Sequence, residues 1–169
     1  MGLQYATLQD LAQAATNGWT ELAQRASPDA TVTAELLQAT VEGADRNAWT
    51  PQAQAAADAA LARLQDALER ASRHADTYLY PRYRAHMPLP PELIAGSSLP
   101  AAVASIAIKR LYGTSVPEDL RKGSQWADDY LRDFSAGKVS LGAPDLDVAQ
   151  PAGQMVSRTQ HKAFDWSRY

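Results

Sequence analysis

The side chains that most often perform catalysis or bind metals are few in this chain and lie far apart. The three histidines are His74, His86 and His161, and none has a carboxylate or a second histidine at metal-ligand spacing. The sequence has no cysteine, which excludes disulfides and thiolate zinc sites. Glycine-rich phosphate-binding motifs and the Gly-x-Ser-x-Gly motif of hydrolases do not occur in it either. The sequence therefore predicts no catalytic centre, no cofactor and no metal site, so we expect a protein that is not an enzyme.

The adjacent carboxylates Asp128 and Asp129 are the strongest remaining candidates for metal-assisted chemistry. Neighbouring residues of a helix point in different directions, so we expect these side chains to form a solvated face. We likewise expect His74 to lie on the polar side of a long helix. An enzyme that uses the two aspartates with a metal ion is kept as a third hypothesis, which stabilisation by divalent ions would support.

Arginines and tyrosines gather around the middle of the chain and suggest a binding surface. A nucleic-acid interpretation would use the arginines for phosphates and the tyrosines for base stacking. A structural interpretation pairs the arginines with acidic residues of this or a neighbouring subunit, while the tyrosines fill a corner of the fold. The net charge of -3 and the pI of about 5.6 favour the structural interpretation, because general nucleic-acid binders are basic. The cluster comprises Arg70, Arg73, Tyr78, Tyr80, Arg82, Tyr83 and Arg84.

The end of the chain carries a second concentration of aromatic and cationic residues. Aromatic residues and arginines in this combination are typical of binding hot spots. Docking on another protein chain is the favoured interpretation, and packing against the protein's own core is the alternative. The residues that we expect to dock are Phe164, Trp166, Arg168 and Tyr169.

Alanine-rich segments with apolar residues at helical spacing predict an all-α fold. We expect a compact bundle over residues 1–142, with short N-terminal helices and one long central helix, followed by an extended C-terminal tail over residues 143–169. Thr7, Thr20, Thr50 and Ser115 are the predicted N-caps. The predicted helices cover residues 8–15, 21–26, 33–42, 51–80, 101–112 and 117–135.

The long helix should end or kink at Pro81, and residues 81–91 should form an extended, rigid corner because they contain four prolines. Gly43 and Gly137 should end helices, whereas Gly123 should only weaken the last one. No apolar run approaches the roughly 18 residues that span a membrane, and the first ten residues do not resemble a secretory signal. We therefore expect the protein to be cytoplasmic when it is made.

Four motifs in this order carry a resemblance to a known family. They are Tyr5-Ala6-Thr7-x-x-Asp10-Leu11, Tyr78-Leu79-x-x-Arg82-Tyr83 followed by Pro88-Leu89, Leu111-Tyr112-Gly113, and Ala136-Gly137-Lys138-x-x-Leu141. Together they resemble the gp36-type family of Mu-like phages, and the resemblance extends over residues 5–142. The alanine-rich long helix, Gly123 and the linker of residues 143–157 depart from the family pattern.

The resemblance implies a structural virion protein, the head–tail adaptor or head-completion connector of a tailed phage. Such subunits form a ring, here expected to be dodecameric, between the portal protein and the stopper or tail-terminator protein, and packaged DNA passes through it without sequence specificity. The protein would then reside at the neck of the virion, after assembly in the host cytoplasm. The C-terminal aromatic residues would dock on the portal. The corner would contact neighbouring subunits through Tyr78, Arg82, Tyr83, Arg84, Pro88 and Leu89. The alternative is a helical DNA-binding or DNA-packaging accessory protein, whose affinity for DNA would fall steeply with salt.

Overall fold

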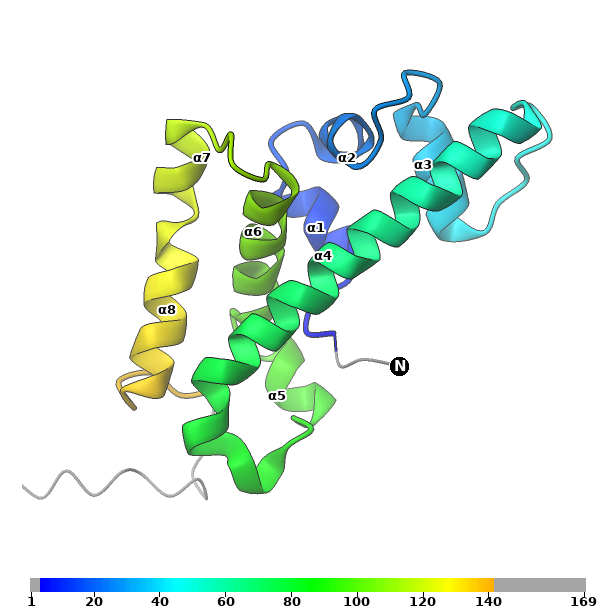
Figure 1. Cartoon of the computed structure of the whole chain (residues 1–169). Helices are drawn as coiled ribbons and strands as arrows, with labels where there is room; N and C mark the ends of the chain where they lie inside the picture. Colours follow the sequence, from blue (N-terminus) through cyan, green and yellow to red (C-terminus); the bar gives the residue numbers. More distant parts are fainter. Residues whose placement is uncertain (1–3, 142–169) are drawn as a thin grey trace, which may run out of the picture.

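The computed structural model describes residues 4–141, and this part of the chain is built from helices joined by short loops. It confirms the predicted all-α class, with one long helix and shorter N-terminal helices (Figure 1). Among the described helices, none combines the length and the apolar character needed to cross a membrane. The helices are α1 (Leu8–Ala14), α2 (Gly18–Ala26), α3 (Ala34–Glu42), α4 (Pro51–Tyr83), the 3₁₀ turn η1 (Arg84–His86), α5 (Pro91–Ala95), α6 (Leu99–Leu111), α7 (Glu118–Gly123) and α8 (Gln125–Ser135).

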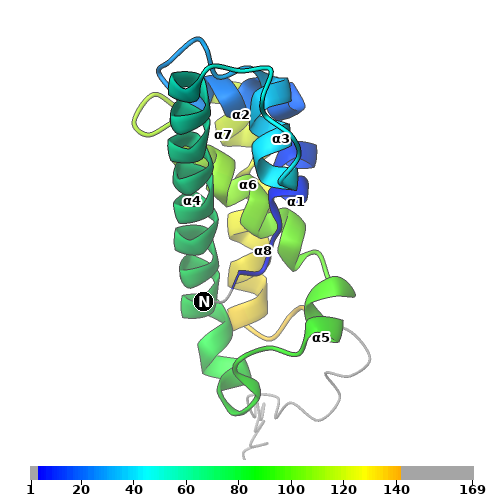
Figure 2. The ribbon, with the colours of Figure 1, turned by 90° about the vertical axis from the view of Figure 1, so that its right-hand side faces the viewer.

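Helix α4 is the longest described helix, and most of the other helices pack against it. Its start follows the predicted capping chemistry, because Thr50 Oγ1 accepts a hydrogen bond from the Ala53 amide at 3.2 Å and Pro51 occupies the first turn. Its 33 residues correspond to a length of about 50 Å. Leu64, Leu68 and other residues at i+3/i+4 spacing are fully buried. Figure 2 shows α4 along one edge of the molecule, with α1, α3, α6 and α8 packed to one side of it.

Helix α6 lies at the centre of the core, as its apolar composition predicts. It packs against α1, α4 and α8. Ala102, Val103 and Ala107 have no exposed surface, and the small alanines allow close approach of the neighbouring helices.

The three N-terminal helices form a cluster against α4 and α6. Thr7 caps α1 as predicted, and Asp10 completes a capping box by accepting a hydrogen bond from the Thr7 amide at 2.8 Å. Thr33, predicted as the first residue of a helix, is instead the N-cap of α3, and its hydroxyl accepts a hydrogen bond from the Leu36 amide at 3.2 Å. The predicted cap at Thr20 is wrong, because α2 already begins at Gly18 and Thr20 lies inside it. The Glu21 carboxylate instead accepts a hydrogen bond from the backbone amide of Asn17 at 3.1 Å. An acidic side chain within α2 thus satisfies the backbone N–H of the residue that precedes the helix.

The last predicted helix is two helices. The break falls at Ser124, between the end of α7 at Gly123 and the start of α8 at Gln125. Glycine lowers the cost of leaving the helix, and Ser124 is buried at the break. The predicted cap Ser115 makes no cap, because Pro117 precedes the first residue of α7. The predicted inner stripe is confirmed for Ala127, Leu131 and Phe134, all fully buried. By contrast, Leu120 and Tyr130 are half-buried.

Helix α4 does not end at Pro81, which was one of the two outcomes predicted there. It continues through the exposed Pro81 to Tyr83 and then tightens into η1. Leu79 and Tyr83 are fully buried on either side of the proline, and this packing holds the helix although Pro81 donates no hydrogen bond. The predicted extended segment is therefore confined to residues 87–90, between η1 and α5.

Candidate docking corner

The end of α4, η1 and the proline segment form the corner, which we define as residues 78–91. The corner lies at the lower end of the molecule in Figure 2, beside α5. It contains three arginine or histidine residues besides its tyrosines and prolines, and no acidic residue. The corner is positioned by α4, which places Tyr78, Arg82 and Tyr83 on the side that faces the body and Tyr80 and Arg84 on the outside.

Tyr83 is the inner anchor of the corner. Its side chain is fully buried, and its ring centroid lies 5.8 Å from that of Phe134 in α8. The Tyr83 hydroxyl accepts a hydrogen bond from the Leu141 amide at 3.4 Å. The same side chain therefore joins α4 to α8 and to the last described residue of the chain.

Arg82 holds the neighbouring backbone. Its guanidinium donates a hydrogen bond to the Val139 carbonyl at 2.5 Å and lies 5.5 Å from the centroid of the Tyr83 ring. This hydrogen bond is made to a backbone carbonyl. Hydrogen bonds from a charged donor are stronger than neutral ones, so Arg82 is well suited to fix residues 139–141 beside the corner.

The N-terminal segment also reaches this end of α4. Tyr5 is buried, its hydroxyl donates a hydrogen bond to Asp76, and its amide donates to Ser72 Oγ at 3.1 Å. The Tyr5 hydroxyl also lies 3.8 Å from the sulfur of Met87. Burial, and secondly the hydrogen bond to Asp76, raises the pKa of Tyr5 well above its ordinary value.

The outer surface of the corner is exposed. Tyr80 has 52% of its surface accessible, and the Arg84 guanidinium lies 5.9 Å from its ring centroid. His86 and Pro88 are exposed, whereas Leu89 is buried in the body. Of the six residues expected to contact neighbouring subunits, the structure uses Tyr83 and Leu89 for the chain's own core. Arg84 and Pro88 lie on the surface, and Tyr78 and Arg82 are half-buried.

The predicted arginine cluster divides into two groups. Arg70 pairs with Asp66 at 2.8 Å and Arg73 pairs with Glu69 at 2.7 Å, each one turn away on the same helix, in agreement with the structural interpretation of the cluster. These pairs neutralise the arginines of the helix surface. Arg82 and Arg84 belong to the corner instead.

Asp128 and Asp129 also pair with cations. Asp128 lies 3.1 Å from the Lys109 ammonium, and Asp129 lies 2.5 Å from the Arg132 guanidinium. Within residues 4–141, no group of three or more carboxylate or imidazole side chains is arranged to hold a metal ion. His74 is half-buried rather than fully solvated, with its ring centroid 5.3 Å from that of Tyr78. Burial, and secondly the positive charge of Arg110, lowers the pKa of His74.

Phe164, Trp166, Arg168 and Tyr169, the expected portal-docking residues, lie outside the described residues. Tyr5, Val139 and Leu141, which bind to the end of α4, were not predicted as functional residues. For Tyr5 and Leu141 the signal was their place in two of the motifs that carry the family resemblance, and for Val139 the sequence offered none.

These contacts define a small helical protein with a packed body and an exposed corner. Residues 139–141 are hydrogen-bonded to this corner. The family described as Bacteriophage Mu, Gp36 matches residues 5–159, and the chain belongs to this family. No curated protein and no solved structure matches the chain.

Proposed function

We propose that this phage protein is a head–tail adaptor, a structural virion subunit that forms a ring beneath the portal and passes DNA toward the tail. Its partners are the portal protein, neighbouring copies, a stopper or tail-terminator protein, and packaged DNA held without sequence specificity. In this proposal the protein acts by assembly and catalyses no reaction, and its place is the neck of the virion. Membership in a family named after a phage Mu protein supports the phage origin on which the proposal rests.

The observation that carries the proposal is the attachment of residues 139–141 to the corner. Arg82 binds the Val139 carbonyl, and Tyr83 accepts a hydrogen bond from the Leu141 amide. The segment with Phe164, Trp166 and Tyr169 is therefore connected to the body at one fixed place. A partner that binds this segment is tethered to the end of the body that carries the exposed corner, so both surfaces can contribute to its binding.

The electrostatics also suit a DNA conduit. The chain has a net charge of -3, and Arg70 and Arg73 on the long helix are paired with carboxylates. A surface of this kind releases few counterions on contact with DNA and therefore binds phosphates weakly. Weak binding allows DNA to move through a ring.

Co-sedimentation with purified portal rings tests the docking role. The wild-type chain is compared with a variant in which Phe164, Trp166 and Tyr169 are replaced by alanine. Trp126→Ala is the matched control, because Trp126 is an aromatic residue of the body with 42% of its surface exposed. We expect wild type and the control to sediment with the portal and the tail variant to stay in solution. Failure of wild type to bind, or unchanged binding of the tail variant, would contradict the proposal.

The alternative class is a helical DNA-binding or DNA-packaging accessory protein. The ion pairs of Arg70 and Arg73 weigh against it, because they neutralise two of the cations that this class would use to bind phosphates. This class predicts DNA affinity that falls steeply as salt rises and that Arg82→Glu abolishes. Gel-shift titrations at two salt concentrations distinguish it from the adaptor.

A further inference from the structure

The corner is a projecting, positively charged surface at one end of the molecule. Arg84, His86, Pro88 and Pro90 are exposed there, and residues 78–91 include no acidic residue, although Glu92 follows directly. Prolines restrict the backbone, so this surface loses little conformational entropy when it binds.

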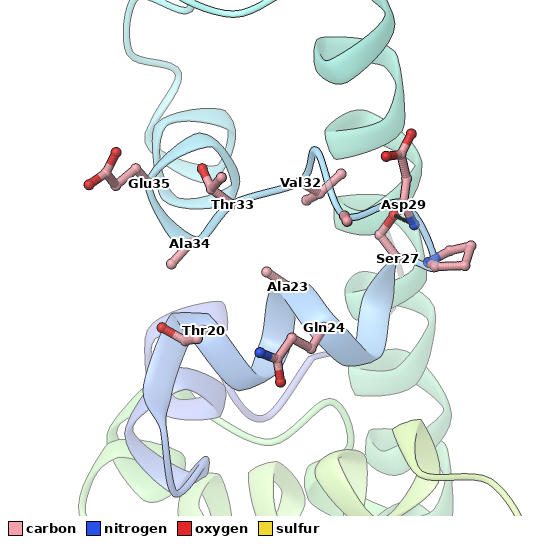
Figure 3. A pocket seen from close by; sticks show the side chains of 11 residues that line it. Thr20, Ala23, Gln24, Ser27, Asp29, Val32, Thr33, Ala34 and Glu35 are labelled. Carbon is pink, nitrogen blue, oxygen red and sulfur yellow. Dashed lines mark hydrogen bonds between the residues drawn. The ribbon is translucent and has the colours of Figure 1, made fainter.

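A groove lies at the opposite end of the molecule, between α2, the α2–α3 loop and the first turn of α3 (Figure 3). Its volume is about 670 Å³. Ala23, Val32 and Ala34 line its middle, and Asp29 and Glu35 stand at its two ends (Figure 3). The groove therefore has an apolar centre and acidic ends. Figure 2 shows α2 and α3 at the upper end of the molecule and the corner at the lower end.

The charge at the groove is not neutralised within the described part of the chain. Residues 4–50 contain six acidic and two basic residues. The two cations are engaged elsewhere, since Arg25 lies 4.0 Å from the Tyr112 ring centroid and Arg46 lies 2.5 Å from Asp58. Asp29 and Glu35 have no ion pair within residues 4–141.

The Asp29 carboxylate keeps its charge. It accepts hydrogen bonds from the amide and the hydroxyl of Thr31, at 2.9 and 2.8 Å, and these bonds lower the pKa of Asp29. The groove thus keeps a negative charge at the end where Asp29 stands, on the same side of the groove as the α2–α3 loop.

We propose that the corner of one copy docks in the α2–α3 groove of the next copy. A projecting cationic surface and a hollow acidic one complement each other in shape and in charge, and both belong to the same chain. Because the two surfaces differ and lie at opposite ends, the contact is head-to-tail, and every copy presents one groove and one corner to its neighbours. Such contacts give a ring when the rotation closes. The inference names the subunit contact that the proposed adaptor ring requires, but it stands on the two surfaces alone.

A single contact of this kind should be weak. A groove of this size accommodates one loop. A contact through one loop buries less surface than the roughly 1,200–2,000 Å² that stable interfaces bury. Closure of a ring adds the strength that one contact lacks, because the last contact forms within a single assembly. The contact should weaken with salt, since its charged groups are exposed.

Cysteine crosslinking tests the contact in the full chain, which has no cysteine of its own. Gln24→Cys places a thiol in the groove and His86→Cys places one on the corner. Oxidation of an equal mixture of the two variants, at millimolar protein and low salt, should give crosslinked dimers. Each variant alone should give none, because a head-to-tail contact does not bring two identical positions together. Gln125→Cys, exposed on α8, replaces either partner in the control mixtures. Equal dimer yields from single variants and mixtures, or no dimer in the specific mixture, would overturn the proposal.

Charge reversal gives a second, independent readout. Glu35→Lys alone or Arg84→Glu alone should lower the yield of the specific crosslink at least about threefold, because an attraction becomes a repulsion. Both reversals introduced into both crosslinking partners should restore the yield. Arg121→Glu on the exposed surface of α7 should leave the yield unchanged. Circular dichroism verifies that each variant is folded. Loss in the single variants without recovery in the double variant would contradict the pairing.

Portal co-sedimentation separates this inference from the proposed function. Crosslinks without portal binding would leave the contact between copies standing and remove the adaptor role. Portal binding without the specific crosslinks would leave the adaptor role standing and remove the proposed contact between copies.

Discussion

Phe134 connects α8 to the inner anchor of the corner, and its removal should destabilise the whole protein. The side chain is fully buried, its ring centroid lies 5.2 Å from that of Tyr130, and it lies 5.8 Å from that of Tyr83. Phe134→Ala deletes a packed ring and leaves a cavity between α4 and α8. The variant also takes from Tyr83 the ring against which it packs.

The expected loss follows from the size of the deleted group. Replacing a buried phenylalanine with alanine costs about 3–5 kcal/mol of unfolding free energy. The two aromatic contacts supply part of this, at about 0.5–1.5 kcal/mol each. A domain of this size loses about 2–4 °C of melting temperature per kcal/mol, so we expect a decrease of about 6–20 °C. Phe134→Leu keeps most of the apolar volume and should lose less.

Urea unfolding followed by circular dichroism at 222 nm measures this free energy. Trp126→Ala is the control, because it removes an aromatic ring from the same helix at a site with 42% exposure and should cost less than about 1 kcal/mol. A loss below about 1 kcal/mol for Phe134→Ala would refute the claim that this ring is packed between α8 and the corner. Equal losses in the two alanine variants would refute it as well.

Further predictions concern pH and two glycines. The pKa of Tyr5 is raised in the folded state, so the unfolded chain loses this proton first and stability should fall as the pH rises above 10; Tyr5→Phe should reduce that fall in urea titrations at alkaline pH. The pKa of His74 is lowered in the folded state, so stability should fall as the pH drops below 6.5, and His74→Gln should flatten the profile there. Gly43 has a φ of 67° at the end of α3, so Gly43→Ala should cost about 1 kcal/mol in urea unfolding. Gly123 has no such φ and open space at its Cβ position, so Gly123→Ala should be neutral or stabilise by up to about 1 kcal/mol.

Helical periodicity and capping residues were sufficient to predict most of the helices. Thr50 and Pro51 marked the start of α4, and the run of apolar residues from residue 101 indicated a central helix. These signals are local, because a cap and the helix it begins are neighbours in the sequence. The break at Gly123 and the continuation through Pro81 depend on packing against other helices, and the sequence pattern does not contain that packing.

The candidate site was predictable only in part. The motif around Arg82 and Tyr83 drew attention to the corner, but the partners of these side chains lie 57 and 58 residues further along the chain. The groove between α2 and α3 had no signal in the sequence, since its lining residues come from two helices and a loop and form no recognisable motif. The acidic residues at its ends suggest a binding role only once the fold shows the groove at one end of the molecule and the cationic corner at the other.

The most direct test of the adaptor proposal is negative-stain imaging of portal rings incubated with the full chain and with a chain truncated after Gly142. The proposal predicts an additional ring of density on portals mixed with the full chain and bare portals with the truncated one. Bare portals in both samples would contradict the adaptor role, and an added ring in both would contradict docking through the C-terminal segment.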